Sequence, residues 1–339
     1  MAAAVLSICG LSLAACADAP AAQTHALGRG VNIGNILDAP YEGAWGLRLE
    51  AELFARAREA GFDTVRLPVR WSSHAEATSP YRIDEAFFRR VDFGIAEALR
   101  HGLNIVVDMH HYKQLDGDPP DPGEAMVDEA VVDERFVAMW AQIAERYRAM
   151  SVDKVFFELY NEPHGRLAAG KWNALLRKAL ATVRAATPGR FVVIGPADHN
   201  RAAALSGLSL PEDDRRIIVT VHLYEPYNFT HQGAPWIAGS SDWLHTRCCS
   251  NEQRGDVVRV LELAQQWARR HDRPMWVGEF GSYEAAEYDS RVEHARLVRQ
   301  EIEARGFSWA YWDLATNFGI FDFQRHAWHS AIKNALLAD

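Results

Sequence analysis

The sequence predicts an α/β protein whose single domain is a (β/α)8 barrel, also called a TIM barrel, with enlarged βα loops. From Arg29 onward, short apolar runs alternate with longer amphipathic stretches, which is the pattern of a parallel sheet with helical crossovers. Eight such units occur, and polar residues recur where the apolar runs end. With 339 residues and 48% hydrophobic content, the chain is large enough to bury one extensive core.

The expected elements follow one another along the chain with no long polar linker between them. We expect strands at 30–33, 64–69, 104–108, 154–160, 191–194, 217–222, 275–279 and 308–312. We expect helices at 47–60, 84–101, 133–150, 171–186, 252–270, 290–305 and 326–337, with the weakest crossover at 201–208. A doubly wound open sheet is the main alternative, but no G-x-G-x-x-G run follows the first strand and no Walker loop occurs.

Two of the expected strands end in a glutamate. The run 155–160 is almost entirely apolar or aromatic and leads to Glu162 and Pro163, and proline cannot continue a strand because it lacks an N–H group. The run 275–279 likewise ends at Glu279, between two glycines. Either glutamate alone is compatible with a solvated loop carboxylate. Because parallel barrels gather their strand ends at one face, the pair predicts a common site.

Other polar and aromatic side chains follow the remaining strands and are expected at the same mouth of the barrel. These are Asn35, Asp38, Arg66, His110, His111, Asn161, His222, Tyr224 and Trp312. Arg66 could instead be an interior charge paired with Glu158. His110 and His111 could bind metal, but neighbouring strand residues face opposite ways, which argues against both binding one ion. The acidic turn at 116–122 is a weak calcium candidate.

The N-terminal segment resembles an export signal. Residues 2–15 form an apolar run too short to span a bilayer, and the run ends at Cys16 in a lipobox-like sequence. We therefore expect a signal peptide at 1–16, a tether at 17–28 and the catalytic domain at 29–339. No Lys or Arg lies between residues 1 and 15, so an ordinary secretory signal cleaved nearby is the alternative. Both interpretations predict an exported protein, either a periplasmic or outer-membrane lipoprotein attached through a lipid anchor or a secreted enzyme.

Charge and composition limit the class of partner. The net charge of −9 argues against nucleic acid, which requires a basic surface. Eleven Trp, ten Tyr and fifteen Phe suit the stacking of neutral rings, although most of them are expected in the core. The adjacent Cys248 and Cys249 have no metal-ligand spacing around them, and we expect a free or occasionally oxidised pair in a surface loop.

Taken together, several runs resemble glycoside hydrolase family 5, the cellulase and mannanase family, over roughly residues 29–337. They are Arg-Leu-Pro-Val at 66–69, Asp-Met-His-His at 108–111, Asn-Glu-Pro at 161–163, His-Leu-Tyr at 222–224, Gly-Glu-Phe-Gly at 278–281 and Tyr-Trp at 311–312. The runs 34–38, 42–45 and 229–236 are similar to bacterial endoglucanases of this family. Asp38 and Asp313 stand where close relatives commonly have Glu, which leaves fine substrate preference open.

The resemblance implies a role for each residue of the expected site. Glu162 would be the general acid/base, with a raised pKa, and Glu279 the ionised nucleophile, the two carboxyls about 5 to 5.5 Å apart as in retaining enzymes. Arg66 and Tyr224 would contact Glu279. The other expected contacts are Asn161 to the sugar 2-hydroxyl, His110 and His222 to hydroxyls and carboxylates, Trp312 beneath the sugar, and Asn35, Asp38, His111, His231 and Trp236 further out. The chemistry needs no metal and no organic cofactor.

These roles predict a monomeric, retaining endo-β-1,4-glycanase that cleaves β-1,4-glucan or a related hemicellulose. A β-mannanase or xyloglucanase of the same family is the nearest alternative, because loop positions decide which sugar is preferred. A glycan-binding lipoprotein without turnover is an alternative from another class. A metal-dependent barrel hydrolase is the third, and it would require His110 and His222 to converge with carboxylates on one ion.

Overall fold

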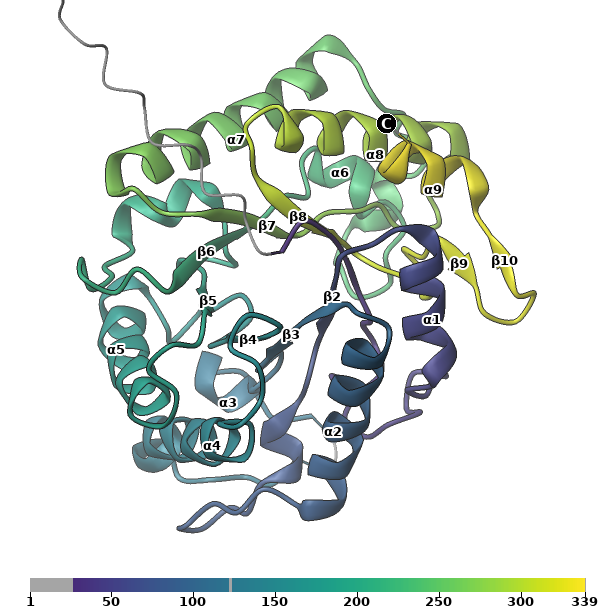
Figure 1. The fold of residues 1–339 in the computed structure, drawn as a ribbon. Helices are drawn as coiled ribbons and strands as arrows, with labels where there is room; N and C mark the ends of the chain where they lie inside the picture. The colour runs from purple at the N-terminus through teal and green to yellow at the C-terminus, as the bar shows by residue number, and fades with distance from the viewer. Residues whose placement is uncertain (1–26, 122–123, 339) are drawn as a thin grey trace, which may run out of the picture.

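The computed structural model describes residues 27–121 and 124–338 and contains a closed eight-stranded parallel barrel (Figure 1). The strands occur in sequence order, and β8 pairs with β1 to close the ring. They are β1 (Arg29–Asn32), β2 (Thr64–Leu67), β3 (Asn104–Asp108), β4 (Val155–Glu158), β5 (Val192–Ile194), β6 (Ile217–His222), β7 (Met275–Glu279) and β8 (Ser308–Tyr311). The predicted fold class and all eight predicted strands are therefore confirmed.

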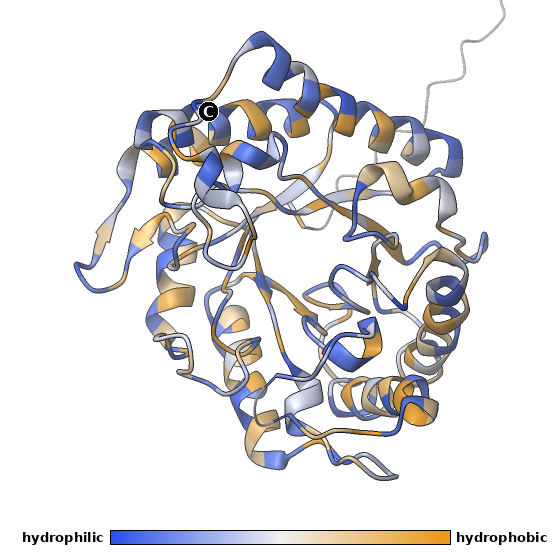
Figure 2. Ribbon diagram, turned by 180° about the vertical axis from the view of Figure 1, so that it is seen from behind, coloured by the Kyte–Doolittle hydropathy of each residue, from blue (hydrophilic) through white to orange (hydrophobic). Residues whose placement is uncertain are grey.

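Helices surround the barrel on its outside (Figure 1). The longer ones are α1 (Ala51–Ala60), α2 (Glu85–Arg100), α4 (Val132–Arg146), α5 (Ala169–Ala186), α7 (Asn251–His271), α8 (Tyr288–Glu303) and α9 (Ser330–Leu337). Short helices lie in the loops: η1 (Trp71–His74), α3 (Lys113–Asp116), η2 (Glu129–Val131), η3 (Ala202–Gly207), α6 (Tyr227–Thr230) and η4 (Ser240–Trp243). Hydrophobic and hydrophilic residues mix along these helices (Figure 2), as expected for helices with one buried face.

Local chemistry sets several helix starts. The Asp84 carboxylate accepts a hydrogen bond from the backbone N–H of Ala86 and caps α2. Ser250 and Gln253 form a reciprocal capping box at the start of α7. Such caps satisfy N–H groups that lack a partner in the first helical turn, and each is worth about 1 kcal/mol. The predicted start of α2 at residue 84 is thus its capping residue.

The barrel interior has an apolar layer of its own, separate from the larger core between strands and helices. Its members come from β3 to β8 and from the segment before β1: Leu27, Val106, Phe156, Val193, Ile218, Trp276 and Ala310. Leu27 is fully buried there, although we expected it at the end of a tether. The folded domain therefore includes Leu27 and Gly28, while the predicted signal peptide and the rest of the tether lie outside the described residues.

Two predicted elements differ from the structure. The stretch expected as one closing helix at 326–337 contains the strand β10 (Ala327–Trp328), which pairs antiparallel with β9 (Phe321–Asp322), and only then α9. The fifth crossover is reduced to the one short helix η3, consistent with its weak pattern. Among the described residues, no helix is long and apolar enough to cross a membrane.

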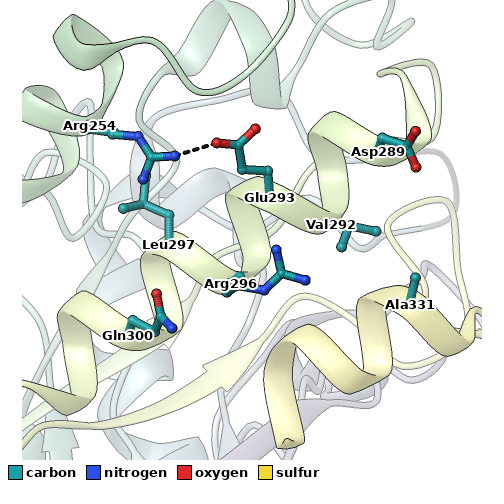
Figure 3. Close-up of a pocket in the computed structure, with 8 residues that line it drawn as sticks. All are labelled: Arg254, Asp289, Val292, Glu293, Arg296, Leu297, Gln300 and Ala331. Atoms are coloured by element: carbon teal, nitrogen blue, oxygen red, sulfur yellow. Dashed lines mark hydrogen bonds and ion pairs between the residues drawn. The ribbon is translucent and has the colours of Figure 1, made fainter.

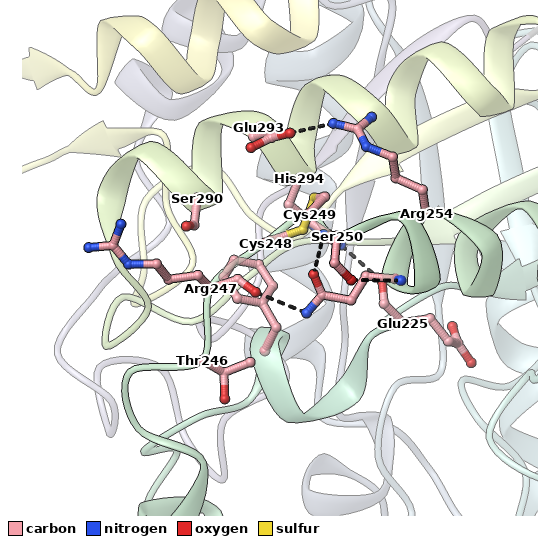
Figure 4. The surroundings of a disulfide bond; sticks show 12 residues. Glu225, Thr246, Arg247, Cys248, Cys249, Ser250, Arg254, Ser290, Glu293 and His294 are labelled. Carbon is pink, nitrogen blue, oxygen red and sulfur yellow. Dashed lines mark hydrogen bonds and ion pairs between the residues drawn. A yellow bond between two sulfur atoms is a disulfide. The ribbon is translucent and has the colours of Figure 1, made fainter.

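The cysteine prediction is wrong in its main point, because Cys248 and Cys249 form a disulfide bond (Figure 4). Cys248 is buried in a small cluster with Phe229 and Ala286, so it does not lie openly on a surface loop. The bond sits directly before Ser250, the residue that caps α7. It links two neighbouring residues of the segment that leads into α7.

Candidate active site

A fully buried arginine organises the polar end of the barrel. The Arg66 guanidinium contacts Glu158 at 2.7 and 2.9 Å, Asp108 at 2.8 Å and Glu279 at 2.7 Å. It also donates to the amide oxygens of Asn32 at 3.0 Å and Asn161 at 2.8 Å. The alternative of an Arg66–Glu158 pair and the expected contact to Glu279 are thus both present, because one planar fork can serve several acceptors.

Glu279 ends β7 and is held through both carboxylate oxygens. Its Oε1 accepts from Arg66, and its Oε2 accepts from the Tyr224 hydroxyl at 2.8 Å. Arg66 and Tyr224 thereby fix the position of the Glu279 carboxylate.

Glu162 lies beyond the end of β4 on a left-handed backbone with φ of 50°. Its Oε1 is 2.7 Å from Nδ1 of His222, and the same nitrogen is 3.5 Å from Oε2 of Glu279. One carboxylate oxygen of each glutamate and one ring nitrogen of His222 all lie within 4.8 Å of one another. This spacing is close to the roughly 5 to 5.5 Å of retaining glycosidases and well under the roughly 6.5 to 9.5 Å of inverting ones.

The pKa values of Glu162 and His222 are shifted from their usual ranges, and the shift of Glu162 differs from the one we expected. Burial acts to raise the pKa of Glu162, but the hydrogen bond and charge of His222 and the nearby His199 ring outweigh it and hold that pKa well below its usual range. Burial acts to lower the pKa of His222, but Glu279 and Glu162 outweigh it and raise that pKa. The pKa of Glu162 is thus shifted downward, opposite to the raised pKa that we expected.

His110 and Trp312 form a stacked pair beside the two glutamates. Their rings are 5.4 Å apart and nearly parallel, and His110 Nδ1 lies 2.8 Å from Asp108. Gly34 is required here, because an added Cβ would lie 2.7 Å from the Trp312 ring. Burial lowers the pKa of His110 to about 3. His110 is therefore a neutral group next to an aromatic platform, suited to hydrogen-bonding an uncharged ligand.

A family model described as Cellulase (glycosyl hydrolase family 5) matches residues 27–318. The chain belongs to glycoside hydrolase family 5. Among solved structures of the family, Thermotoga maritima Cel5A in complex with mannotriose is 42% identical, with a TM-score of 0.86 over 91% of this chain and 97% of that one. The same protein in complex with cellobiose gives the same values.

Curated relatives in family 5 include Endoglucanase H of Acetivibrio thermocellus, which is 32% identical over 323 residues. That match covers 94% of this chain but 33% of the relative, and Cellulase/esterase CelE of the same organism is covered to 35%. The chain thus spans about a third of the length of these two proteins. Endoglucanase B of Clostridium cellulovorans is 28% identical, with 88% of this chain and 70% of the relative covered.

The family 5 site also brings together Asp38, His110 and His111, whose potential ligand atoms lie within 4.8 Å of one another. The argument that adjacent histidines face opposite ways fails, because β3 ends at Asp108 and both rings lie beyond it, 4.6 Å apart. His222, however, groups with Glu162 and Glu279. The described residues therefore place His110 and His222 in two different potential cation sites, not in the single one that a metal-dependent hydrolase would require.

The outer residues of the family 5 site divide into exposed and buried ones. Trp236 is 55% exposed and packs edge-on against Tyr283. Asn35 is partly exposed and has a φ of 61°. His231, by contrast, is buried against Tyr224 and Tyr227, with rings 4.9 and 4.2 Å away. His231 therefore packs against Tyr224, the residue that holds Glu279, and is not an exposed residue of the cleft.

Sequence reasoning missed several residues of the site. Asn32 donates to the carbonyl oxygens of Gly278 and Tyr311 while its own oxygen accepts from Arg66. His199 approaches Glu162 to 3.9 Å, and Asn200 approaches His222 to 3.3 Å. The run Asp-His-Asn at 198–200 was the available signal, because these residue types tolerate left-handed backbone better than others.

A separate surface groove of about 390 Å³ lies between α7, α8 and α9 (Figure 3). It is lined by Arg254, Asp289, Val292, Glu293, Arg296, Leu297, Gln300 and Ala331. The Arg254 and Glu293 side chains pair across it. None of the site residues described above borders this groove, so it is not part of the catalytic site.

Proposed function

We propose that the chain is a retaining endo-β-1,4-glycanase that hydrolyses β-1,4-glucan or a related hemicellulose by double displacement. The observation that carries this proposal is the close pair Glu162 and Glu279, whose carboxylates have different partners. Glu279 is held by a cation and a hydroxyl, whereas Glu162 is held by a titratable histidine. One carboxylate is thus held in place for attack on the anomeric carbon, and the other lies against a group that can exchange a proton.

In the first step, Glu279 attacks the anomeric carbon while Glu162 protonates the leaving oxygen. Glu162 needs a proton for this step, and His222, whose Nδ1 is 2.7 Å from Oε1 of Glu162, is a titratable group in direct contact with it. Formation of the glycosyl ester removes the charge of Glu279, which was one cause of the raised pKa of His222. Glu162 then accepts a proton from the water that hydrolyses the ester.

Neighbouring groups position the sugar for this reaction. Arg66 holds the oxygen of the Asn161 amide at 2.8 Å, which leaves the amide nitrogen free to donate to the sugar 2-hydroxyl. Trp312 supplies the apolar face beneath the sugar, and His110 supplies a neutral ring at its edge. Exposed Trp45 and Trp236 add aromatic faces beyond the catalytic centre, which suits an enzyme that binds the middle of a chain.

Both glucan and mannan are candidate substrates. The Thermotoga maritima protein has been solved with cellobiose and with mannotriose, and several curated relatives carry endoglucanase names. The side chain of Asp38 is one carbon shorter than the Glu that close relatives commonly have at this position, so its reach toward a sugar differs. Comparing rates on carboxymethylcellulose, barley glucan, glucomannan, mannan and xyloglucan separates the endoglucanase from the mannanase and xyloglucanase alternatives.

The decisive test is Glu279→Gln, which keeps the shape of the nucleophile and removes its charge. We expect turnover to fall by several orders of magnitude while oligosaccharide binding persists, and we expect proton NMR of wild-type products to show the β anomer first. Glu301→Gln on α8, where the wild-type side chain pairs with Arg305 far from the two glutamates of the site, serves as the control. An active Glu279→Gln enzyme would overturn the mechanism, and a wild-type chain that binds glycans without turnover would favour the glycan-binding lipoprotein.

We also propose that the protein is exported and acts as a monomer at the cell envelope or outside the cell. The support is the apolar N-terminal run that ends at Cys16. Labelling cells with a radioactive fatty acid, with Cys16→Ala as the control, tests lipidation. Label that is retained in Cys16→Ala would contradict lipidation of Cys16, and size-exclusion chromatography coupled to light scattering would test the monomer.

A further inference from the structure

The loop after β5 contains an unusual backbone. Asp198, His199 and Asn200 have φ values of 59°, 58° and 55°, so three successive residues other than glycine adopt the left-handed conformation. Such residues normally occur singly, because the Cβ atom crowds the following carbonyl oxygen. Strained backbone persists where the surrounding structure enforces it, and it clusters at functional sites.

The last residue of this turn supports the catalytic histidine. The side-chain nitrogen of Asn200 lies 3.3 Å from Nε2 of His222, and the Asn200 carbonyl oxygen accepts the backbone N–H of His222 at 3.0 Å. Gly195 makes room for this side chain, because an added Cβ would lie 2.0 Å from the Asn200 amide oxygen. The strained turn is therefore anchored to the residue that binds Glu162.

The middle residue of the turn lies beside the other oxygen of Glu162. His222 occupies Oε1 at 2.7 Å, whereas His199 Nδ1 is 3.9 Å from Oε2. Because Oε1 is already engaged, Oε2 is the oxygen available to protonate the leaving group. The side chain of His199 is 43% exposed, compared with 2% for His222, so a sugar can reach it.

The backbone of the acid/base segment fixes the position of the His199 ring. The His199 N–H donates to the Pro163 carbonyl oxygen at 3.3 Å. Its ring stacks on that of His164 with centroids 4.2 Å apart, and His164 Nδ1 contacts the Glu162 carbonyl oxygen at 2.7 Å. The two stacked imidazoles are thus held against the residue that delivers the proton.

We propose that His199, supported by His164, binds the sugar on the leaving-group side of the scissile bond. This inference rests on the proposed glycanase function and adds to it a residue that selects for a sugar as leaving group. Its ring edge would hydrogen-bond a hydroxyl of that sugar and hold the glycosidic oxygen at Oε2 of Glu162. The left-handed turn explains how an exposed side chain can keep a fixed position there.

Two substrates separate this role from a structural one. Cellotetraose carries sugars on the leaving-group side, whereas β-cellobiosyl fluoride carries none and releases fluoride. We expect His199→Asn, which tolerates left-handed backbone, to lower kcat/KM for cellotetraose by about tenfold more than for the fluoride, since one hydrogen bond to a sugar hydroxyl is worth about that factor. His199→Gln provides a second variant if His199→Asn folds poorly.

His326→Asn is the matched control, because His326 also has a left-handed φ of 48° but lies in the β9–β10 connection and pairs with Glu52. It should leave the ratio of the two kcat/KM values unchanged. Equal losses on both substrates in His199→Asn and His199→Gln would overturn the role of His199 while leaving the glycanase function intact. A wild-type enzyme inactive on both substrates would refute the proposed function itself.

Discussion

Replacing Arg66 by methionine should destabilise the barrel in a pH-dependent way. Arg66 is fully buried and is the cation shared by the carboxylates of Asp108, Glu158 and Glu279, at 2.7 to 2.8 Å. Methionine keeps much of the volume and removes the charge. Because Asp108 and Glu158 are themselves fully buried, the variant leaves two carboxylates without their cationic partner or obliges them to bind protons.

The magnitude follows from the cost of uncompensated buried charge. Removing one partner of a buried ion pair costs about 3–5 kcal/mol, and a domain of this size loses about 2 °C in Tm per kcal/mol, so we expect a loss of about 6–10 °C at pH 8. Burial raises the pKa of Asp108 to about 6 and raises that of Glu158, although Arg66 opposes both shifts. Without Arg66 both pKa values rise further, so the folded variant binds more protons than the unfolded chain.

The sign of the pH dependence is therefore fixed: the destabilisation should shrink as the pH falls from 8 to 5. Thermal unfolding of wild type and Arg66→Met at both pH values measures it. Arg190→Met is the matched control, because Arg190 is equally buried but, within the described residues, donates hydrogen bonds to backbone carbonyl oxygens and not to carboxylates. The loss of stability in this variant should not depend on pH in this range. The same loss of Tm at pH 5 and pH 8 in Arg66→Met would refute the charge argument.

Three further predictions concern Asp38, Tyr224 and the disulfide bond. Burial raises the pKa of Asp38 to about 7, so its charged form destabilises the fold as the pH rises from about 4 through 7. Asp38→Asn should then raise Tm at pH 8 and change it little at pH 5, and a gain that is the same at both pH values would count against this. Tyr224→Phe removes the 2.8 Å hydrogen bond to Glu279 and should lower kcat by about ten- to hundredfold; an unchanged kcat would show that Arg66 alone suffices. Because Cys248 and Cys249 are disulfide-bonded, the folded, non-reduced protein should show neither as alkylated by mass spectrometry, and label on either before reduction would contradict the bond.

Much of the site could be predicted from the sequence because its residues end strands. Glu279 and His222 are the last residues of β7 and β6, and a mostly apolar run precedes each of them in the sequence. Since a parallel barrel gathers all such ends at one mouth, their meeting follows from the topology. Glu162 was predictable for a related reason, because Pro163 stops the strand pattern near it.

The residues that sequence reasoning missed are those placed by loops or by the barrel interior. His199 reaches Glu162 through three left-handed residues, a path that no periodic pattern encodes. Asn32 looks like an ordinary strand residue until β7 and β8 supply the carbonyl oxygens that it binds. The disulfide between Cys248 and Cys249 also depends on the local backbone, which two adjacent cysteines do not specify.

The sequence by itself determined the eight-unit barrel, the membership of family 5 and the two glutamates, because each depends on apolar periodicity or on a run of adjacent residues. Only the tertiary structure decided in which direction the pKa values of Glu162 and His222 shift. The pKa values of Glu162 and His222 depend on burial and on charges from β6, β7 and the loop after β5. Coulomb energies vary with distances of a few ångströms between segments far apart in the chain, and those distances exist only once the barrel has closed.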